Sequence, residues 1–323
     1  MLNAIKEKMG ECKWKCKIYL GKLKGSTLPN DFDFINLKNI EIETFSFCNR
    51  QCWFCPNSFI DRHTQNIEMS EKLYLSILEQ LAEIHFAGTL SFSRYNEPLA
   101  KRELILTRIK QAREFLPNAI LTTNTNGDYL TKDYIDALCD AGLNSLNIQH
   151  YLQKNEVFEA TSIKKSFAQV AAKLGLEYRI SREISGRIEA EFIYPNMKIT
   201  ARARDFRKNG CTRGDSLTTI EKTNRITGCL IPYIALYIDY NGQIVPCCNL
   251  RSDFAPHKRY VLGDCNNESL REIFNNKNTL TFRKNVKGWV HIDVCKNCKF
   301  HDGYVGYMED MDYIRERQKK NKY

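Results

Sequence analysis

The chain has 323 residues, 43% of them hydrophobic, which is enough for one large globular domain and a smaller one. Its formal net charge is +10, yet it contains no run of about 18 apolar residues and no basic patch interleaved with aromatics, so neither a membrane span nor nucleic-acid binding is expected. Thirteen cysteines, an odd number, gather in close sets, which favours reduced metal-binding thiols over disulfides and hence a cytoplasmic protein.

Basic residues are concentrated at both ends of the chain, and such runs usually form solvated faces. Residues 1–38 are therefore expected to form a basic N-terminal extension, and residues 311–323 a basic C-terminal tail. The extension also contains Cys12 and Cys16, which lack a third cysteine nearby and are interpreted as structural.

Short apolar runs alternate with longer amphipathic segments between residues 39 and 215, which is the pattern of repeated β-α units. In the longer segments, apolar residues recur every three or four positions, as in helices that pack on a sheet. Strands are expected at residues 40–45, 89–92, 119–123, 146–149, 177–180 and 189–193, and helices at 69–86, 102–115, 132–141 and 157–174. Because a full eight-stranded barrel takes about 250 residues, the predicted fold class is α/β, with a partial (β/α)6 barrel over residues 39–215.

Three cysteines, Cys48, Cys52 and Cys55, follow the first expected strand, and the next cysteine is Cys139. Three thiolates can hold three irons of a cubane cluster and leave the fourth iron open, whereas a zinc site normally has a fourth protein ligand nearby. A zinc knuckle or reduced structural thiols are the alternatives. The triplet therefore favours a cluster with an open iron at which chemistry can occur.

The Cys-x3-Cys-x2-Cys spacing, with the aromatic Phe54 before the third cysteine, resembles that of the radical S-adenosylmethionine (SAM) superfamily. The resemblance implies a [4Fe–4S] cluster on Cys48, Cys52 and Cys55, with SAM bound to the open iron. It also implies that SAM is cleaved to a 5′-deoxyadenosyl radical, which abstracts a hydrogen atom from a substrate. The partner implied is a low-potential electron donor such as flavodoxin or ferredoxin.

Polar residues follow the next expected strands, at the edge of the sheet where barrel active sites lie. In the superfamily, a Gly-Gly-Glu-Pro element after the second strand contacts the amino group of SAM, and Tyr95-Asn96-Glu97-Pro98 occupies that position here without either glycine. Asn126-Gly127 is typical of a turn, but its place after a strand also predicts contact with SAM or substrate. The expected cofactor contacts are Phe54, Asn96, Glu97, Asn124, Asn126, Gln149 and Arg182.

A second region, expected at residues 225–310, contains another cysteine set. A β-hairpin is predicted at residues 237–247, turning at Asn241-Gly242. Four thiolates bind either zinc or an iron–sulfur cluster, and spacing alone leaves both open. The resemblance extends to radical SAM proteins with a C-terminal SPASM or twitch domain, which implies a small auxiliary domain holding a second, auxiliary [4Fe–4S] cluster. Its implied ligands are Cys229, Cys247, Cys295 and Cys298.

A second cluster beside a radical site is suited to accept the electron left when a substrate radical is deprotonated. The predicted reaction is therefore two-electron oxidation of an alcohol carbon in a sugar- or cyclitol-type small molecule. Arginines between residues 202 and 213 favour an anionic substrate. Arg213 is predicted to bind the substrate or to assist its deprotonation, and a surface arginine in a linker is the alternative.

Cys248 is predicted either to be a buried thiol or to act in catalysis. On a continuing strand its side chain would point away from that of Cys247. Cys248 or Cys265 would otherwise replace an assigned ligand or donate hydrogen to a substrate radical, as sugar epimerisation requires. Peptide maturation is another alternative, although only 38 residues precede the first expected strand, where such enzymes often carry a recognition domain. The last alternative is a non-catalytic metal-binding scaffold, which would not cleave SAM.

Overall fold

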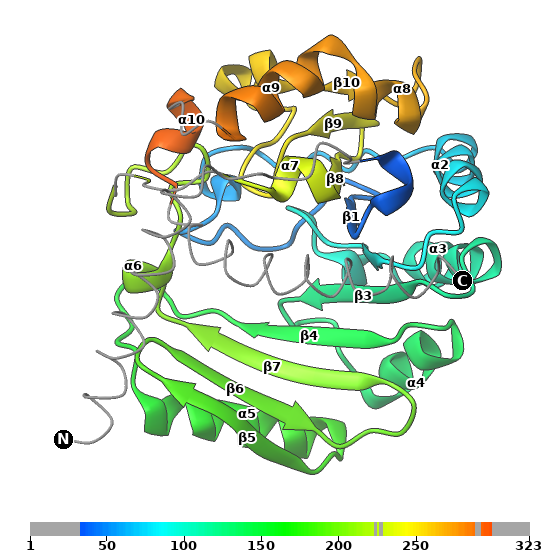
Figure 1. Cartoon of the computed structure of the whole chain (residues 1–323). Helices are drawn as coiled ribbons and strands as arrows, with labels where there is room; N and C mark the ends of the chain where they lie inside the picture. The colour runs from blue at the N-terminus through cyan, green and yellow to red at the C-terminus, as the bar shows by residue number, and fades with distance from the viewer. Residues whose placement is uncertain (1–32, 223–224, 226–228, 288–291, 299–323) are drawn as a thin grey trace, which may run out of the picture. The chain divides into compact units, whose positions relative to one another are not determined.

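The computed structural model describes residues 33–222, 225, 229–287 and 292–298. Residues from Phe34 onward form one unit, and its strands build a single ten-stranded mixed sheet (Figure 1). The order across the sheet is β10-β9-β8-β1-β2-β3-β4-β7-β6-β5. The strands are β1 (Asn39–Ile42), β2 (Thr89–Ser91), β3 (Ile120–Thr125), β4 (Ser145–His150), β5 (Tyr178–Ile184), β6 (Arg187–Phe192), β7 (Lys198–Arg204), β8 (Ala235–Ile238), β9 (Gln243–Val245) and β10 (Gly263–Asp264).

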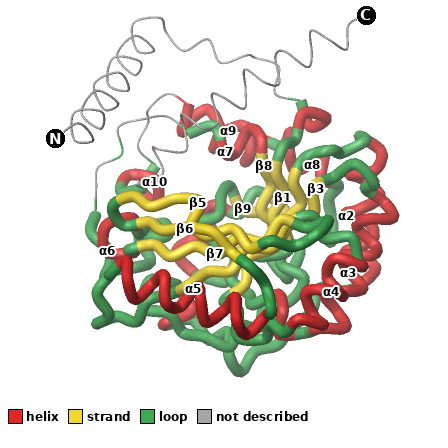
Figure 2. Tube along the Cα trace, turned by 90° about the horizontal axis from the view of Figure 1, so that it is seen from below, coloured by secondary structure: helices red, strands yellow, loops and turns green. Residues whose placement is uncertain are grey.

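Four long helices follow the first four strands in turn and lie along one side of the sheet (Figure 2). They are α2 (Glu71–Glu83), α3 (Arg102–Phe115), α4 (Lys132–Asp140) and α5 (Ala160–Leu174), within the ranges expected from apolar periodicity. The other helices are α6 (Phe206–Asn209), α7 (Ile231–Ile234), α8 (Leu270–Asn275), α9 (Lys277–Lys287) and α10 (Asp293–Lys296), with 3-10 turns η1 (Phe34–Asn36), η2 (Pro56–Ser58), η3 (Pro98–Ala100) and η4 (Ala255–Tyr260). No described helix is long and apolar enough to cross a membrane.

Local sequence signals explain where these helices begin and end. The Ser70 hydroxyl accepts a hydrogen bond from the backbone N–H of Leu73 at the start of α2, and the Thr131 hydroxyl caps α4 in the same way. α5 ends at Gly175, whose left-handed φ of 63° suits a residue without a Cβ. Caps and apolar stripes together place these helices on the sheet.

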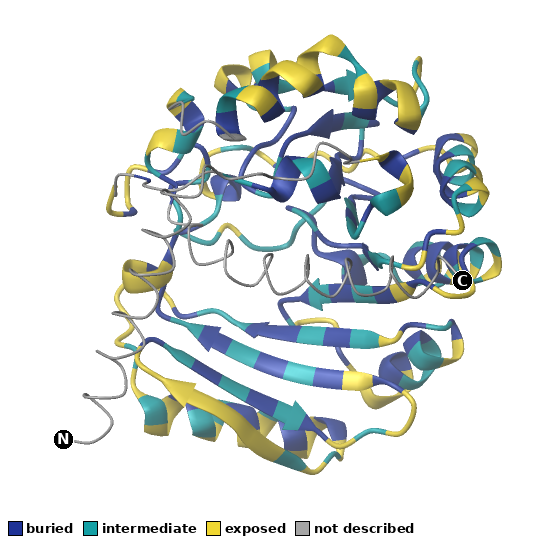
Figure 3. Cartoon of the chain, in the orientation of Figure 1, coloured by how far each residue is buried: buried dark blue, intermediate teal, exposed yellow. Residues whose placement is uncertain are grey.

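Buried and partly exposed residues alternate along strands such as β6 and β7, so that one face of the sheet is covered and the other is partly open (Figure 3). On β7, Ile199 and Ala201 are buried in the core with residues of α5, while Arg202 and Arg204 are partly exposed on the opposite face. β1 alternates in the same way, with Ile40 buried and Glu41 partly exposed. The polar face is therefore available for a site.

The outer strands differ from the expected run of β-α units. β5 and β6 form an antiparallel hairpin, and β6 pairs antiparallel with β7. The connection between β5 and β6 contains only Ser185 and Gly186, which is too short for the crossover that a parallel pair requires. The parallel position after β4 is taken by β7, which was not among the expected strands.

β8 and β9 form the predicted hairpin, with Gly242 at a φ of 85° in its turn. β8 also pairs in parallel with β1, so this second region continues the sheet. The expected boundaries at 39–215 and 225–310 stay a prediction. The tail at 311–323 and all but the last six residues of the 1–38 extension, including Cys12 and Cys16, lie outside the described residues.

Candidate active site

The cysteine triplet lies on one loop that begins after β1. The backbone N–H of Cys55 donates to the carbonyl of Cys52 and that of Cys48 to the carbonyl of Arg62, both at 2.9 Å. All three thiols are partly exposed. Burial raises the pKa of Cys48 to about 11 and that of Cys52 to about 12, and Cys55 raises both. The thiols are thus close to one another, and binding a metal must displace their protons.

Phe54 fixes this loop to the rest of the site. Its ring stacks on Phe206, with 3.7 Å between ring centroids and 2° between planes, and it contacts Tyr151 at 5.0 Å. It is 5% exposed and packs with Leu217 and Ile220. The side chain thus anchors the loop near the carboxyl end of β7, and its cofactor contact stays a prediction.

The loops after β1, β2 and β3 are tied together through Glu97. The Glu97 carboxylate accepts hydrogen bonds from the Thr125 hydroxyl at 2.6 Å and from the backbone N–H groups of Asn126 at 2.7 Å and Leu99 at 3.1 Å. Asn126 Nδ2 donates to Asn49 Oδ1 in the cysteine loop at 2.8 Å. Burial raises the pKa of Glu97 to about 7. The three loops therefore meet at one edge, as parallel strands predict.

Asn96, next to Glu97, has a buried amide that is only half satisfied. Its Oδ1 accepts from the Arg94 N–H at 3.1 Å, whereas its Nδ2 has no partner among the described residues. An unpaired buried donor is costly unless a ligand accepts from it. This donor fits the predicted contact with a bound cofactor.

A row of polar side chains crosses the inner face of β3, β4 and β7. Asn124 Nδ2 donates to Ser93 Oγ at 2.8 Å, and Gln149 Nε2 donates to Asn124 Oδ1 at 3.3 Å. The Arg202 guanidinium then donates to Gln149 Oε1 at 3.1 and 3.2 Å. Two predicted contact residues, Asn124 and Gln149, thus lie together, and Arg202 joins them.

Arg182 does not join this row. It is exposed on β5, the edge strand, where it is paired in register with Glu189 of β6. The hairpin carries it away from β4, because β6 and β7 lie between them in the sheet. Its predicted cofactor contact gains no support from this position.

A cavity of about 680 Å³ lies beside the cysteine loop. That volume is in the range of sites for cofactor-sized ligands. Its walls come from the cysteine loop and from the carboxyl ends of β3 and β4, and they include Arg50, Cys52, Asn126, Gln149 and Tyr151. Cys52 of the triplet and these four polar side chains thus line one cavity.

The second cysteine set lines a smaller cavity together with Arg225 and Asn249. Burial raises the pKa of Cys295 to about 12 and that of Cys247 well above its usual value, and Cys229 lies close enough to raise both. Within the described residues, no three potential ligands converge on one point where a single metal ion would sit. The four thiols that share this cavity are Cys229, Cys247, Cys295 and Cys298.

Comparison with known families matches both cysteine regions. Residues 42–150 match the radical SAM superfamily, and residues 229–299 match SPASM, an iron–sulfur cluster-binding domain. The chain thus contains a radical SAM domain followed by a SPASM domain. Both matches cover the regions that the cysteine patterns singled out, and the SPASM match begins at Cys229.

Two curated proteins and a crystal structure resemble this radical SAM enzyme. It is 28% identical, over 85% of its own length and 97% of the other, to the S-adenosyl-L-methionine-dependent 2-deoxy-scyllo-inosamine dehydrogenase of Niallia circulans. It is 30% identical to the GTP 3′,8-cyclase of Nautilia profundicola, over 57% of its length and 62% of the cyclase. The crystal structure of BtrN in complex with AdoMet and 2-DOIA superimposes with a TM-score of 0.59 at 24% identity, over 81% of this chain and 93% of BtrN. The fold is therefore that of a radical SAM protein with an auxiliary domain.

A radical SAM enzyme uses SAM and a [4Fe–4S] cluster, and a SPASM domain binds iron–sulfur clusters. The residues present fit these groups. Three neighbouring thiols beside a cofactor-sized cavity suit a cluster with one open iron, and four thiols around the second cavity suit a fully ligated one. Assignment of the individual ligands remains a prediction.

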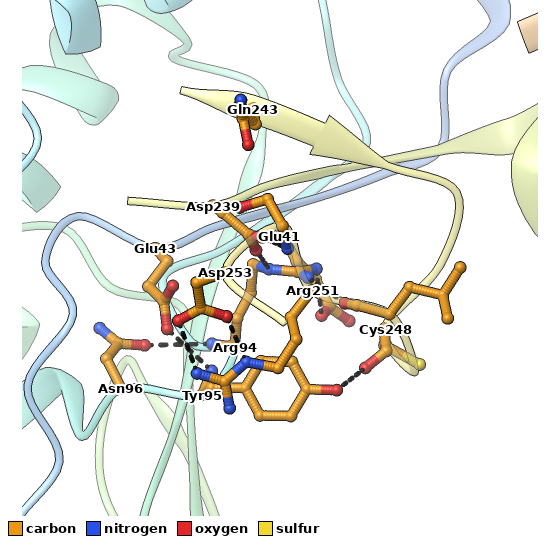
Figure 4. Close-up of polar contacts among 12 residues, drawn as sticks. Glu41, Glu43, Arg94, Tyr95, Asn96, Asp239, Gln243, Cys248, Arg251 and Asp253 are labelled. Carbon is orange, nitrogen blue, oxygen red and sulfur yellow. Dashed lines mark hydrogen bonds and ion pairs between the residues drawn. The ribbon is translucent and has the colours of Figure 1, made fainter. Parts of the chain in front are cut away.

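A buried ionic network of the radical SAM enzyme lies next to Cys248 (Figure 4). Arg94 Nε donates to Asp239 Oδ1 at 2.7 Å, while Arg94 Nη1 is 4.0 Å from Glu41 Oε2. Tyr95 donates from its hydroxyl to the carbonyl of Cys248 at 2.9 Å. Burial raises the pKa of Glu41 to about 7, although Arg94 and Arg213 lower it. Glu41 is thus a carboxylate without a close ion pair, and its side chain is 25% exposed.

Arg213 and Cys248 share the neighbourhood of Glu41. Arg213 Nη1 donates to Asn249 Oδ1 at 3.2 Å and lies 3.4 Å from the carbonyl of Cys248. Burial opposes the charge of Arg213, but Tyr95 and Cys248 outweigh it and hold its pKa above the usual value. Burial raises the pKa of the Cys248 thiol to about 12, and Glu41 raises it further. Cys248 thus lies near Glu41 and Arg213, whereas Cys247 lines the auxiliary cavity.

Three residues of this site were missed by sequence reasoning. Glu41 carried a signal, because a carboxylate inside a strand of a parallel sheet must face either a partner or a ligand. Arg225 and Asn249 carried none, because their importance depends on which cysteines the fold brings beside them.

Proposed function

We propose that this radical SAM enzyme oxidises an alcohol carbon of a polyhydroxylated small molecule, of the sugar or cyclitol type, to a ketone. Similarity to a dehydrogenase over 97% of that protein's length carries the proposal. The neighbourhood of Glu41, Arg213 and Cys248 supports it. Cys55 of the triplet and Cys248 both raise the pKa of Arg213. Arg213 also contacts Asn249, which donates to the auxiliary Cys298.

The bound cofactors would supply a 5′-deoxyadenosyl radical that takes the hydrogen atom and an iron–sulfur cluster that takes the electron. The substrate therefore loses a hydrogen atom, a proton and an electron, which together convert a secondary alcohol to a ketone. Glu41 accepts the hydroxyl proton in this proposal. Arg213 binds the substrate oxygen instead, because a guanidinium with a raised pKa keeps its proton.

Overall, one SAM and one alcohol give methionine, 5′-deoxyadenosine, a ketone and a proton. The electron needed to cleave SAM equals the electron that the substrate releases, so the sum requires no net reductant. A low-potential flavodoxin or ferredoxin would still deliver the first electron. Reduced thiols and oxygen-sensitive clusters fit a cytoplasmic setting for this proposal.

Removing the auxiliary thiols is expected to separate the two halves of the reaction. Cys295→Ala combined with Cys298→Ala should lower the iron content from about eight to about four per chain, because one [4Fe–4S] cluster loses two ligands. 5′-Deoxyadenosine should still form, but the ketone should not. Anaerobic reconstitution, iron analysis and mass spectrometry of products measure both.

Cys139→Ala is the matched control for those thiols, because Cys139 lies on α4 outside both cysteine sets. It should keep about eight irons and full turnover. Ketone formation that survives loss of the auxiliary iron would rule out an electron-acceptor role.

Arginines on the polar face favour a substrate with an anionic group. Arg204 has no carboxylate partner among the described residues, and its Nε is buried without any partner. Burial, together with Arg202 and Arg213, lowers its pKa to about 10. By contrast, buried Arg62 and Arg94 each have a carboxylate within 4.0 Å. An anion bound at Arg204 would relieve this uncompensated charge.

Arg204→Gln is expected to weaken anion binding by about ten- to a hundredfold, the effect of losing one charge-assisted hydrogen bond. Titration calorimetry of the reconstituted enzyme with inorganic pyrophosphate measures this loss. Equilibrium dialysis with SAM distinguishes a cofactor role, since weaker SAM binding with unchanged pyrophosphate binding would assign Arg204 to the cofactor. Arg179→Gln, an exposed arginine on β5, is the control and should leave both affinities unchanged.

Epimerisation is a second candidate that one observation favours. The Cys248 thiol stays protonated at neutral pH and lies near Glu41 and Arg213, so it is placed to return a hydrogen atom. The resulting thiyl radical would then take one electron, from the flavodoxin- or ferredoxin-type donor, and one proton. An epimerised product would keep the substrate's oxidation state and take one deuterium from D2O at the reacting carbon, whereas a ketone product excludes this route.

A further inference from the structure

Asn249 connects the substrate-side residues to the auxiliary cysteines. It is 4% exposed, and its Nδ2 donates to Cys298 Sγ at 3.7 Å. Its backbone N–H donates to the thiol of Cys247, and its Oδ1 accepts from Arg213 Nη1 at 3.2 Å. One buried residue therefore contacts two auxiliary thiols and the arginine beside Glu41.

The loop that carries Arg213 is also held against the auxiliary cysteines. Arg213, Gly214 and Asp215 all have left-handed φ angles, of 51°, 63° and 62°. This conformation is costly for residues with a Cβ and persists only where contacts enforce it. Asp215 accepts two contacts from Asn297 Nδ2, at 2.8 and 3.0 Å, and Asn297 lies between Cys295 and Cys298 in sequence. The Arg213–Asn249 and Asp215–Asn297 contacts thus fix this loop relative to the auxiliary cysteines.

Reduction of an iron–sulfur cluster adds negative charge, and N–H groups that donate to its sulfurs favour the reduced form. The Arg213 cation at Oδ1 polarises the Asn249 amide and strengthens its Nδ2–H as a donor. Arg225 also favours the reduced form of the cluster, because its guanidinium donates a hydrogen bond to the thiol of Cys295. The site therefore favours uptake of an electron.

Building on the proposed role of the auxiliary cluster as electron acceptor, we propose that Asn249 is a positioning residue that raises the reduction potential of that cluster and couples it to Arg213. A change at the substrate side of Arg213 then changes how readily the cluster accepts an electron. Asn249 needs no contact with substrate for this role.

Redox titration followed by electron paramagnetic resonance tests the proposal without substrate. A background with Cys48, Cys52 and Cys55 replaced by alanine leaves the auxiliary cluster as the sole signal. Asn249→Asp keeps the side-chain shape but replaces the donor by a carboxylate, so the midpoint potential should fall. Asn249→Ala should give a smaller fall. Asn267→Asp, the same change at an exposed position, should leave the potential unchanged.

Arg213→Gln tests the coupling, because Arg213 contacts none of the assigned ligands and a merely structural role would not move the potential. Arg213→Gln should lower the midpoint potential of the auxiliary cluster, as the Asn249 variants do. Unchanged potentials in both Asn249 variants, with about four irons per chain retained, would overturn the proposal. A fall in the Asn249 variants without one in Arg213→Gln would overturn the coupling. If Asn249→Asp does not retain its iron, the midpoint potentials of Asn249→Ala and Arg213→Gln test the proposal instead. Because the redox titration contains no substrate, its result does not depend on whether the enzyme oxidises an alcohol.

Discussion

Alanine at Cys48, Cys52 and Cys55 together is expected to reduce SAM cleavage to background while about four irons per chain remain. The three thiols lie on one loop, and removing them leaves the ligands of the auxiliary cavity in place. Anaerobic reconstitution with dithionite and SAM, followed by chromatography of 5′-deoxyadenosine, measures the loss. Iron analysis and the thiolate-to-iron absorption bands measure the auxiliary cluster that remains.

Cys265→Ala is the matched control for the triplet, because its thiol is packed against the main core and lies outside both cavities. It should retain SAM cleavage and about eight irons. Loss of all iron in the triplet variant would contradict two independent sites. If the triplet variant cleaved SAM at the wild-type rate, the triplet would have no role in the reaction.

The parts of the fold that sequence predicted are those that local patterning determines. Strand-and-helix alternation gave β1 to β4 and α2 to α5, because each buries one face and shows a clear period. The same reasoning predicted that the loops after β1, β2 and β3 meet. Glu97 and Asn126 confirm this through the hydrogen bond between them.

Other parts depended on contacts that no local pattern records. In β7, lysine and arginine alternate with residues such as Ala201 and Ala203, so its weak apolar signal was interpreted as an arginine cluster. The hairpin of β5 and β6 was predictable, because only eight residues, 181–188, separate the two expected strands, which is too few for a helical crossover. Asn249 became visible as a site residue only where the fold brought Arg213 and Cys298 to either side of it.

Glu41→Gln is expected to lower the rate of ketone formation by about 10²- to 10⁴-fold, the contribution of a general base. The glutamine keeps the shape of the side chain but cannot accept the hydroxyl proton. The fold should be retained, because the closest ion-pair partner of Arg94 is Asp239 and not Glu41. 5′-Deoxyadenosine should still form, so the ratio of ketone to 5′-deoxyadenosine falls.

The dependence of the rate on pH, compared between the wild type and Glu41→Gln, tests Glu41 as the base, because the pKa of Glu97 is also about 7. Burial raises the pKa of Glu41 to about 7, against the lowering effects of Arg94 and Arg213. Below that pH the carboxyl holds a proton and cannot act as a base, so the wild-type rate should rise with pH up to about 7 and then level off. Arg94 and Arg213 stay charged over this range, and the Cys248 thiol, with its pKa of about 12, stays neutral.

Glu41→Gln should remove this rise and leave a flat, low profile. Glu191→Gln is the control, because Glu191 is a partly exposed carboxylate on β6 that pairs with Arg179 and faces none of these groups. It should keep the wild-type profile. If Glu41→Gln kept the rise near pH 7, the base would have to be another group, and Arg213 with its raised pKa would still be excluded. These profiles therefore test whether Glu41 takes a proton from the substrate beside the residues that Asn249 connects to the auxiliary thiols.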